Sequence, residues 1–137
     1  MATLERTVAT LRISGDSLDP AEITTLLGCA PTTAQTKGQL IIGKHTGAER
    51  IAKFGMWHLE ASPQEPGDLD AQIAELLGRL TDDLGIWKQI ASTYNSDLFC
   101  GLFMAGSNEG LSLAPASLVA LGGRGIELSL DIYGGYS

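Results

Sequence analysis

The chain has 137 residues, of which 44% are hydrophobic and 18% are charged, and its formal net charge is −7. This length predicts a single domain over residues 1–137, with a core that needs no disulfide or metal. The composition excludes an intrinsically disordered chain, and the acidic balance argues against nucleic-acid binding, because basic residues bind the phosphate backbone.

The first strand and helix are predicted from alternation and from the residues at the helix ends. Residues 7–14 alternate between apolar and polar side chains, which predicts a strand with one buried face. Asp19, Pro20 and Gly28 then predict a short helix, because they suit its N-terminal cap, its first turn and its end.

The middle of the chain combines short strand signals with a long helical pattern. Residues 40–42 are a candidate strand that leads into a turn at residues 43–47. Residues 54–61 alternate again and place Trp57 in the core. Between residues 68 and 85, apolar side chains recur at helical spacing, which predicts one long helix.

The C-terminal part is predicted to hold two strands and a second short helix. Gly85 is expected to break or kink the long helix before a further turn or two, and residues 98–104 are apolar on both faces, as in a central strand. Ala114 and Pro115 open the short helix, and residues 126–133 alternate strictly as the last strand. The apolar residues of that strand are expected to face inward: Ile126, Leu128, Leu130 and Ile132.

An internal repeat supports a particular fold. Residues 17–28 and 112–123 match at six of twelve positions, and each segment lies between two predicted strands. Two β-α-β units with an extra long helix between them would form a ferredoxin-like α+β fold, a two-layer sandwich with a mainly antiparallel sheet. Alternatively, the match reflects only the proline and glycine that recur at the ends of short helices. The predicted fold brings four side chains into one interior: Leu11, Trp57, Leu102 and Leu130.

Cysteine content and the length of the apolar runs predict a cytoplasmic protein. A secreted disulfide scaffold of this size would carry more cysteines than Cys29 and Cys100. No apolar run is long enough to span a membrane, and the N-terminus lacks the apolar stretch of a signal peptide. We therefore expect no association with membranes.

The charge is distributed unevenly along the chain. Residues 1–60 hold as many basic as acidic side chains, so residues 61–137 carry the whole net charge of −7. Within the first part, Lys37 to Lys53 form a locally basic segment. This distribution predicts a solvated basic loop and an acidic helix face.

Several short motifs, taken in order, resemble a known family. They are Leu18-Asp-Pro, Leu27-Gly28, Pro31-Thr32, Lys37-Gly38, Gly55-Met-Trp57 and Leu130-Asp-Ile-Tyr133. The chain is similar to a bacterial family of small proteins catalogued as a domain of unknown function (number four-two-seven-nine). The resemblance implies a compact α+β domain in the bacterial cytosol and implies no reaction, ligand or catalytic residue.

Motifs for enzymatic chemistry are weak in this sequence. Gly38 to Lys44 resemble a phosphate-binding loop, but His45 stands where a hydroxyl residue would bind magnesium, and the interior of the motif favours a strand. The histidines and cysteines show no metal-ligand spacing. Ser107 lies in a predicted turn and Cys100 in an apolar run, so neither is an activated nucleophile. We expect no metal and no cofactor.

One group of polar side chains is a candidate contact surface. The outward faces of three predicted strands would gather on one sheet face, where helices do not cover them. The candidate site residues are Arg12, Met56, His58, Glu60, Asp131 and Tyr133, with Glu127 beside them. The sequence leaves three interpretations of this face open. The first is a ligand cleft that uses His58 as an acid–base group under the basic loop. The second is a surface for a partner or second subunit, and the third is a solvated face with cross-strand ion pairs.

These observations favour a non-catalytic protein-binding or homo-oligomerising module, with a homodimer or another protein as its partner. A first alternative is a small enzyme or anion-binding protein that uses His58 and Arg12. A second alternative is an acidic immunity-type protein, whose charge of −7 attracts a basic partner. The sequence leaves enzymatic activity open and leans against it.

Overall fold

The computed structural model describes residues 4–134. Within these residues the helices are α1 (Pro20–Leu27), α2 (Leu69–Gly78), α3 (Leu84–Thr93) and α4 (Pro115–Gly123). The main sheet has the strand order β2-β5-β1-β6-β7. Its strands are β1 (Arg6–Gly15), β2 (Thr33–Gln35), β5 (Gly55–Glu60), β6 (Asn95–Phe103) and β7 (Glu127–Tyr133). A separate hairpin consists of β3 (Leu40–Ile42) and β4 (Glu49–Ile51).

Strand β1 lies at the centre of the main sheet. It pairs antiparallel with β5 on one side and with β6 on the other, so that Leu11 lies opposite both Leu59 and Leu98. Ala9, Leu11 and Ile13 are buried, whereas the residues between them are only half-buried. The alternation predicted for residues 7–14 is therefore confirmed, and it separates a core face from a second face.

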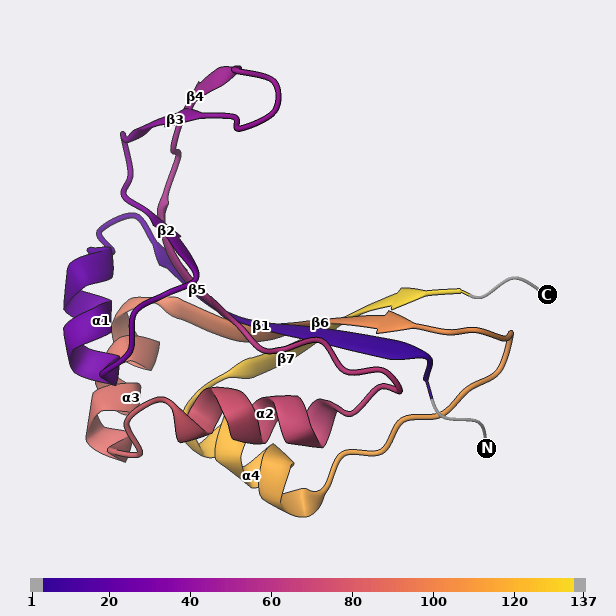
Figure 1. Ribbon diagram of the computed structural model, residues 1–137. Helices are drawn as coiled ribbons and strands as arrows, with labels where there is room; N and C mark the ends of the chain where they lie inside the picture. Colours follow the sequence, from indigo (N-terminus) through magenta and orange to yellow (C-terminus); the bar gives the residue numbers. More distant parts are fainter. Residues whose placement is uncertain (1–3, 135–137) are drawn as a thin grey trace.

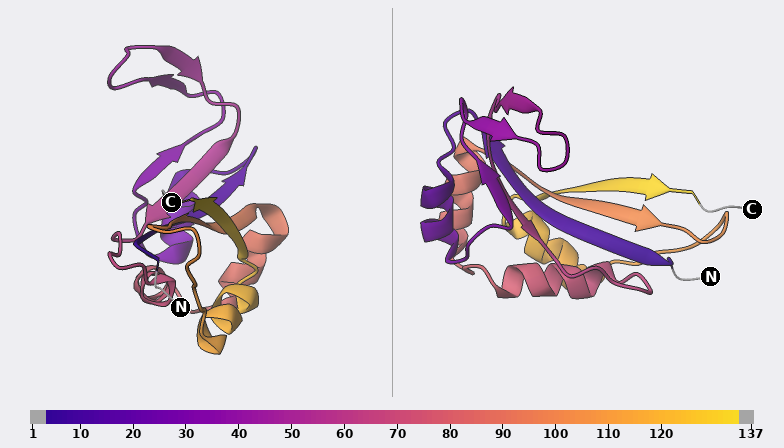
Figure 2. Two further views of the ribbon diagram at one scale, coloured as in Figure 1. Left: turned by 90° about the vertical axis from the view of Figure 1, so that its right-hand side faces the viewer. Right: turned by 45° about the horizontal axis from the view of Figure 1, so that its top comes forward.

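The helices gather on the core face of the sheet (Figures 1 and 2). Helices α2 and α4 lie beneath the strands in Figure 1, and the left view of Figure 2 shows the helices on one side of the sheet. We call the opposite face, which points away from α2 and α4, the open face. The side chains on this face include Arg6, Val8, Thr10, Arg12, Ser14, Met56, His58, Glu60, Asp97, Phe99, Phe103, Glu127, Ser129, Asp131 and Tyr133.

Two tryptophans fill the core and are hydrogen-bonded at their polar ends. Trp57 and Trp87 are each 0% exposed. The indole N–H of Trp57 donates to Thr24 Oγ1 at 3.1 Å, and that of Trp87 donates to the carbonyl oxygen of Thr81 at 2.8 Å. Burying an indole N–H costs free energy unless it has a hydrogen-bond partner, and here helix α1 and the α2–α3 connection supply the partners.

A buried polar cluster joins β1 to α2. Gln72 is 0% exposed; its side-chain amide donates to the carbonyl oxygens of Thr7 (2.9 Å) and Ser62 (3.0 Å) and accepts from Thr7 Oγ1 (2.8 Å). Thr7 Oγ1 also accepts from the backbone N–H of Asp68, the N-cap residue of α2. The cluster therefore fixes where α2 starts against the central strand.

Several expectations from the sequence are confirmed. The protein is α+β with a mainly antiparallel sheet. Helix α1 begins and ends as predicted, because Asp19 accepts from the N–H of Ala21 at 3.1 Å and Gly28 adopts a left-handed φ of 80°. Trp57 is buried on β5, and the turn at residues 43–47 connects β3 to β4.

The expectation of one long helix over residues 68–85 is wrong. Helix α2 ends at Gly78 and α3 begins at Leu84. The break has a local cause: the side chain of Asp83 accepts from the N–H of Gly85 at 2.9 Å and so caps a new helix. The helical spacing of apolar side chains runs across the break, but it does not mark one buried stripe, because Leu84 is 53% exposed and α3 buries Trp87 and Ile90 instead.

The two predicted β-α-β units form in different ways. In the second half, β6, α4 and β7 make a unit whose parallel strands are neighbours. In the first half, β1 and β2 also run parallel, because each is antiparallel to β5, but β5 lies between them. The three-residue strand β2 was not predicted, and the sequence alone placed no strand in that region.

The expected burial of Leu130 is wrong. Leu11, Trp57 and Leu102 are at most 4% exposed, whereas Leu130 is 46% exposed and Ile132 is 59% exposed. β7 is the edge strand, and its C-terminal half extends beyond the helices that cover its start (Figure 1). Alternation thus predicted the correct face for Leu130, but no helix or strand within residues 4–134 covers that part of the face.

We expect Gln72→Ala to lower the free energy of unfolding by about 2–4 kcal/mol, because it leaves buried carbonyl and hydroxyl groups without partners and opens a small void. Urea denaturation monitored by tryptophan fluorescence measures this loss. The matched control is Gln89→Ala on α3, where the side chain is exposed and the change should stay within about 0.5 kcal/mol. Equal losses in the two variants would show that the buried cluster is not important for stability.

Candidate functional site

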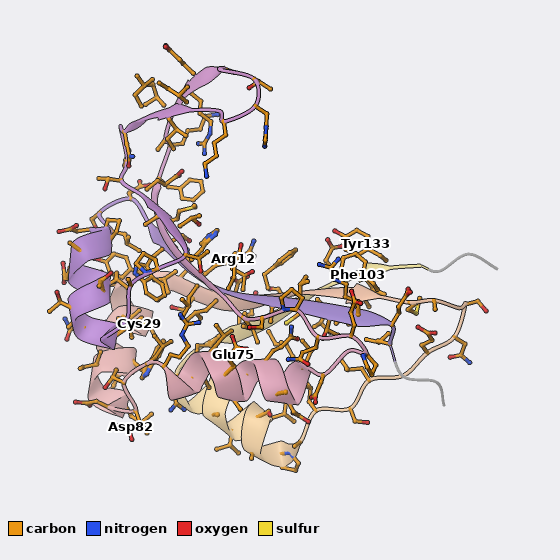
Figure 3. The ribbon with its side chains drawn as sticks, viewed as in Figure 1. Arg12, Cys29, Glu75, Asp82, Phe103 and Tyr133 are labelled. Carbon is orange, nitrogen blue, oxygen red and sulfur yellow. The ribbon has the colours of Figure 1, made fainter. Side chains whose placement is uncertain are left out.

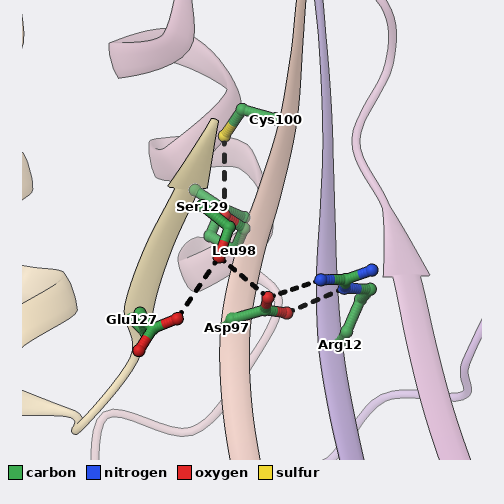
Figure 4. A network of polar contacts seen from close by, with 6 residues as sticks. All are labelled: Arg12, Asp97, Leu98, Cys100, Glu127 and Ser129. Atoms are coloured by element: carbon green, nitrogen blue, oxygen red, sulfur yellow. Dashed lines mark hydrogen bonds and ion pairs between the residues drawn. The ribbon is translucent and has the colours of Figure 1, made fainter. Parts of the chain in front are cut away.

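An ion pair lies at the centre of the open face. Arg12 Nε donates to Asp97 Oδ1 at 2.8 Å, and a second bond joins Arg12 Nη2 to Asp97 Oδ2 (Figure 4). Ser129 Oγ also donates to Asp97, at 3.1 Å. The guanidinium lies 4.4 Å from the ring centroid of Phe99, so its flat face is occupied as well. The hydrogen bond with Asp97 raises the pKa of Arg12, and the two charges neutralise each other.

A hollow of about 570 Å³ surrounds this ion pair. Strands β1, β5, β6 and β7, the end of α3 and the residue before β5 contribute to its walls. The lining residues that matter below are Arg12, Phe54, Met56, His58, Tyr94, Asp97 and Glu127. The hollow contains one positive side chain, Arg12, and two negative ones, Asp97 and Glu127. His58 adds no further charge near pH 7, for the reason given in the next paragraph.

His58 lies directly opposite Arg12 in the β1–β5 register and is half-buried. Burial lowers the pKa of His58 below its ordinary value of 6.5, and the positive charge of Arg12 lowers it further, while Asp97 and Glu60 act in the opposite direction. The imidazole is therefore mainly neutral at pH 7, so it can accept or donate a hydrogen bond but adds no positive charge.

The structure divides the predicted site residues into three groups. Arg12, Met56 and His58 line the hollow, as does Glu127. Glu60 shares the open face but is exposed at the end of β5, outside the hollow. The remaining two predicted residues, Asp131 and Tyr133, lie further along β7.

Asp131 and Tyr133 belong to a second cluster on the open face. Tyr133 stacks on Phe103 with ring centroids 4.6 Å apart and planes at 4°, and its hydroxyl donates to Asp131 Oδ2 at 2.7 Å. This hydrogen bond raises the pKa of Tyr133. Figure 3 shows Phe103 and Tyr133 toward one end of the sheet, with Arg12 nearer its middle.

Residues 36–54, which we call the arm, include the β3–β4 hairpin. The arm projects from the sheet on the side opposite to α2 and α4 (Figure 1). The hypothesis of a basic loop folded over the ligand cleft is wrong for its charged residues: Phe54 lines the hollow, but the arm's lysines and its arginine do not. Instead Lys37 pairs with Asp16 at 3.4 Å, and Arg50 donates to Gln35 Oε1 at 3.3 Å.

Sequence reasoning missed Asp97, the partner of Arg12. The predicted strand began at Leu98, one residue after Asp97, because residues 98–104 are all apolar or glycine and show no alternation. Asp97 and Phe99 point to the open face, whereas Leu98 and Cys100 are buried on the other. Extending the alternation backward by one residue would have added Asp97 to the candidate site, although not its pairing with Arg12.

Residues 4–134 contain neither a candidate metal site nor a helix that could span a membrane. No group of three or more histidine, cysteine, aspartate or glutamate side chains is arranged there to hold a metal ion. No helix in the same part of the chain combines the length and apolar character that crossing a membrane requires.

We expect Arg12→Met to raise the pKa of His58, because the change removes a nearby positive charge, and Asp97→Asn to lower it, because that change removes a negative one. NMR titration of the His58 ring signals measures both shifts. Shifts in the same direction for the two variants would contradict the electrostatic description of the open face.

The same titration has a consequence for stability. Because the pKa of folded His58 lies below the unfolded value of 6.5, the unfolded state binds more protons in the interval between them. The stabilisation that comes from keeping His58 neutral in the folded state is complete above that interval of pH. It is lost as the pH falls through the interval. His58→Gln should therefore reduce the loss of stability as the pH falls below 6.5, as urea denaturation at a series of pH values would measure.

We expect only Cys29 to react with iodoacetamide in the folded protein at neutral pH. Cys100 is 0% exposed, and burial raises the pKa of its thiol to about 12, so it carries almost no reactive thiolate. Mass spectrometry should find one label on the native chain, two in urea and none on native Cys29→Ser. A label on native Cys100 would show that β6 opens readily.

Comparison with known proteins agrees with the resemblance of the short motifs. A family model described as Domain of unknown function (DUF4279) matches residues 5–135, which is nearly the whole chain. No curated protein and no solved structure matched this chain. The chain therefore belongs to the DUF4279 family.

Proposed function

We propose that this protein is a non-catalytic protein-binding module, whose contact surface consists of the arm and the open face. The observation that carries the proposal is the apolar face of the arm. Leu40, Ile42 and Ile51 are 51%, 59% and 57% exposed. Leu40 pairs with Ile51, and the alternation along β3 puts Ile42 on the same side of the hairpin.

Exposed apolar side chains gathered on a projecting hairpin favour association. Each square ångström of apolar surface removed from water contributes about 25 cal/mol, and contiguous apolar patches typically mark interaction sites. A two-stranded hairpin is at best marginally stable alone in water. A partner that covers this face would therefore stabilise both the complex and the arm.

The open face supplies aromatic and arginine side chains of the kind that interfaces use. Phe99 lies under the Arg12 guanidinium, and Phe103 stacks with Tyr133. Tyrosine and arginine are enriched at protein interfaces and at their energetic centres. Because Arg12 is already neutralised by Asp97, its burial under a partner costs less than the burial of an unpaired charge.

The hollow supports a second candidate function, the binding of a small ligand. Its volume of about 570 Å³ lies in the range of small-molecule sites, roughly 300–1,000 Å³. An anion, however, would have to compete with Asp97 for Arg12 and would meet Glu127. The arrangement therefore favours a neutral or cationic ligand over the anionic ligand considered from the sequence.

Three finer features belong to the same proposal. The strand order β2-β5-β1-β6, with β1 parallel to β2, supports a ferredoxin-like two-layer arrangement to which α4 and β7 are added. The thiols of Cys29 and Cys100 are free, which supports a reducing, cytoplasmic location.

An immunity-type role would require a basic partner for the acidic body.

Site-specific photo-cross-linking tests the proposal. The photoreactive residue benzoylphenylalanine replaces Ile42 on the arm or, as the control, Ala74 on the exposed side of α2. After irradiation in cells, the arm variant should give discrete adducts with protein, several-fold more than the helix variant. Equal or absent adducts from the two positions would refute the proposed contact surface. Mass spectrometry then identifies the cross-linked protein.

A further inference from the structure

We infer that the partner of the arm is a second copy of this chain, and that each copy places its arm on the open face of the other. This inference rests on the proposed function, because it names the occupant of the same surface.

The arm and the rest of the chain carry opposite charges. Residues 36–54 contain four basic side chains and one acidic one, a formal charge of +3, whereas the remaining residues sum to −10. Two bodies of this kind repel each other, but an arm is attracted to the body of another copy. Electrostatics therefore selects a dimer in which arms contact bodies.

Unpaired charges lie on both surfaces that would meet. Lys44 and Lys53 of the arm are exposed and, within residues 4–134, form no ion pair. On the open face, Glu60, Glu127 and Asp131 form no ion pair in that part of the chain either. The free charges are thus basic on the arm and acidic around the neutralised Arg12–Asp97 centre.

Apolar groups are placed to accompany these charges. The arm offers Leu40, Ile42 and Ile51, and the open face offers the Phe103–Tyr133 stack, in which Tyr133 is 47% exposed. Burying aliphatic side chains against an aromatic stack removes apolar surface of both from water. The charged groups then contribute orientation, and the apolar groups contribute most of the affinity.

The placement of the two surfaces fits a two-fold dimer. The arm rises from one end of the sheet, and the Phe103–Tyr133 stack lies toward the other end (Figure 3). Two copies that face each other in opposite directions therefore bring each arm over the far end of the other sheet. Every contact then occurs twice, as in an isologous interface, and the association closes at two copies.

Charge reversal on one surface or the other tests this inference. The arm variant carries Lys44→Glu and Lys53→Glu, the face variant carries Glu60→Lys and Asp131→Lys, and Lys88→Glu on α3 is a control for a charge reversal outside both surfaces. None of the five positions is buried, so the fold should persist, and circular dichroism checks this.

The native chain should sediment at about twice 14.4 kDa, and the dimer should weaken between about 0.05 and 0.5 M salt. The arm variant and the face variant should each dimerise roughly tenfold or more weakly, because like charges then meet, whereas Lys88→Glu should not. An equimolar mixture of the two should restore dimers, since opposite charges meet again at both contacts.

Other outcomes would contradict the arm-to-face dimer, the protein-binding function, or both. A dimer that is insensitive to both reversals, or a mixture that stays monomeric, overturns the arm-to-face arrangement. A chain that is monomeric throughout, but whose residue 42 cross-links to a different protein, refutes self-association and leaves the protein-binding function standing. A monomer without any such adduct refutes both.

Discussion

The pairing of β1 with neighbours on both sides is the constraint on which the rest of the structure depends. Because side chains alternate along a strand, a shift of one residue in the register of β1 would exchange its faces. Arg12 would then enter the core, and Leu11 would be exposed to water. The hydrogen bonds to β5 and β6 and the buried cluster around Gln72 together prevent such a shift. They therefore determine which side chains the open face displays.

The position of Arg12 on this central strand organises the charges of the open face. β6 brings Asp97 to one side of Arg12 and β5 brings His58 to the other. Asp97 is the stronger partner, because it meets the guanidinium with two hydrogen bonds, whereas burial and then the same positive charge lower the pKa of His58. The centre of the face is consequently close to neutral, and its free acidic groups lie around it.

Local rules predicted the elements whose causes are local, and they failed where distant parts of the chain decide. The cap of Asp19 and the left-handed Gly28 define α1 within a few residues, so the sequence sufficed. The partner of Arg12 lies 85 residues away, and no sequence pattern specifies that pair. The exposure of Leu130 depends on how far the helices reach along β7. Alternation reports which face a side chain occupies, but it carries no information about what covers that face.

The base of the arm explains how a small hairpin can present an apolar face to a partner. Gln35 is 4% exposed; its amide donates to the carbonyl oxygen of Phe54 at 3.0 Å and accepts from Arg50. These bonds tie both strands leading into the arm to the sheet, while Ile42 and Ile51 remain in water. The entropy of positioning the arm is thus partly lost before any partner arrives, and less is lost on binding. Gln35 therefore favours binding by holding the arm in place. The burial of the exposed apolar side chains on its three-residue strands can then stabilise a complex with a smaller loss of entropy.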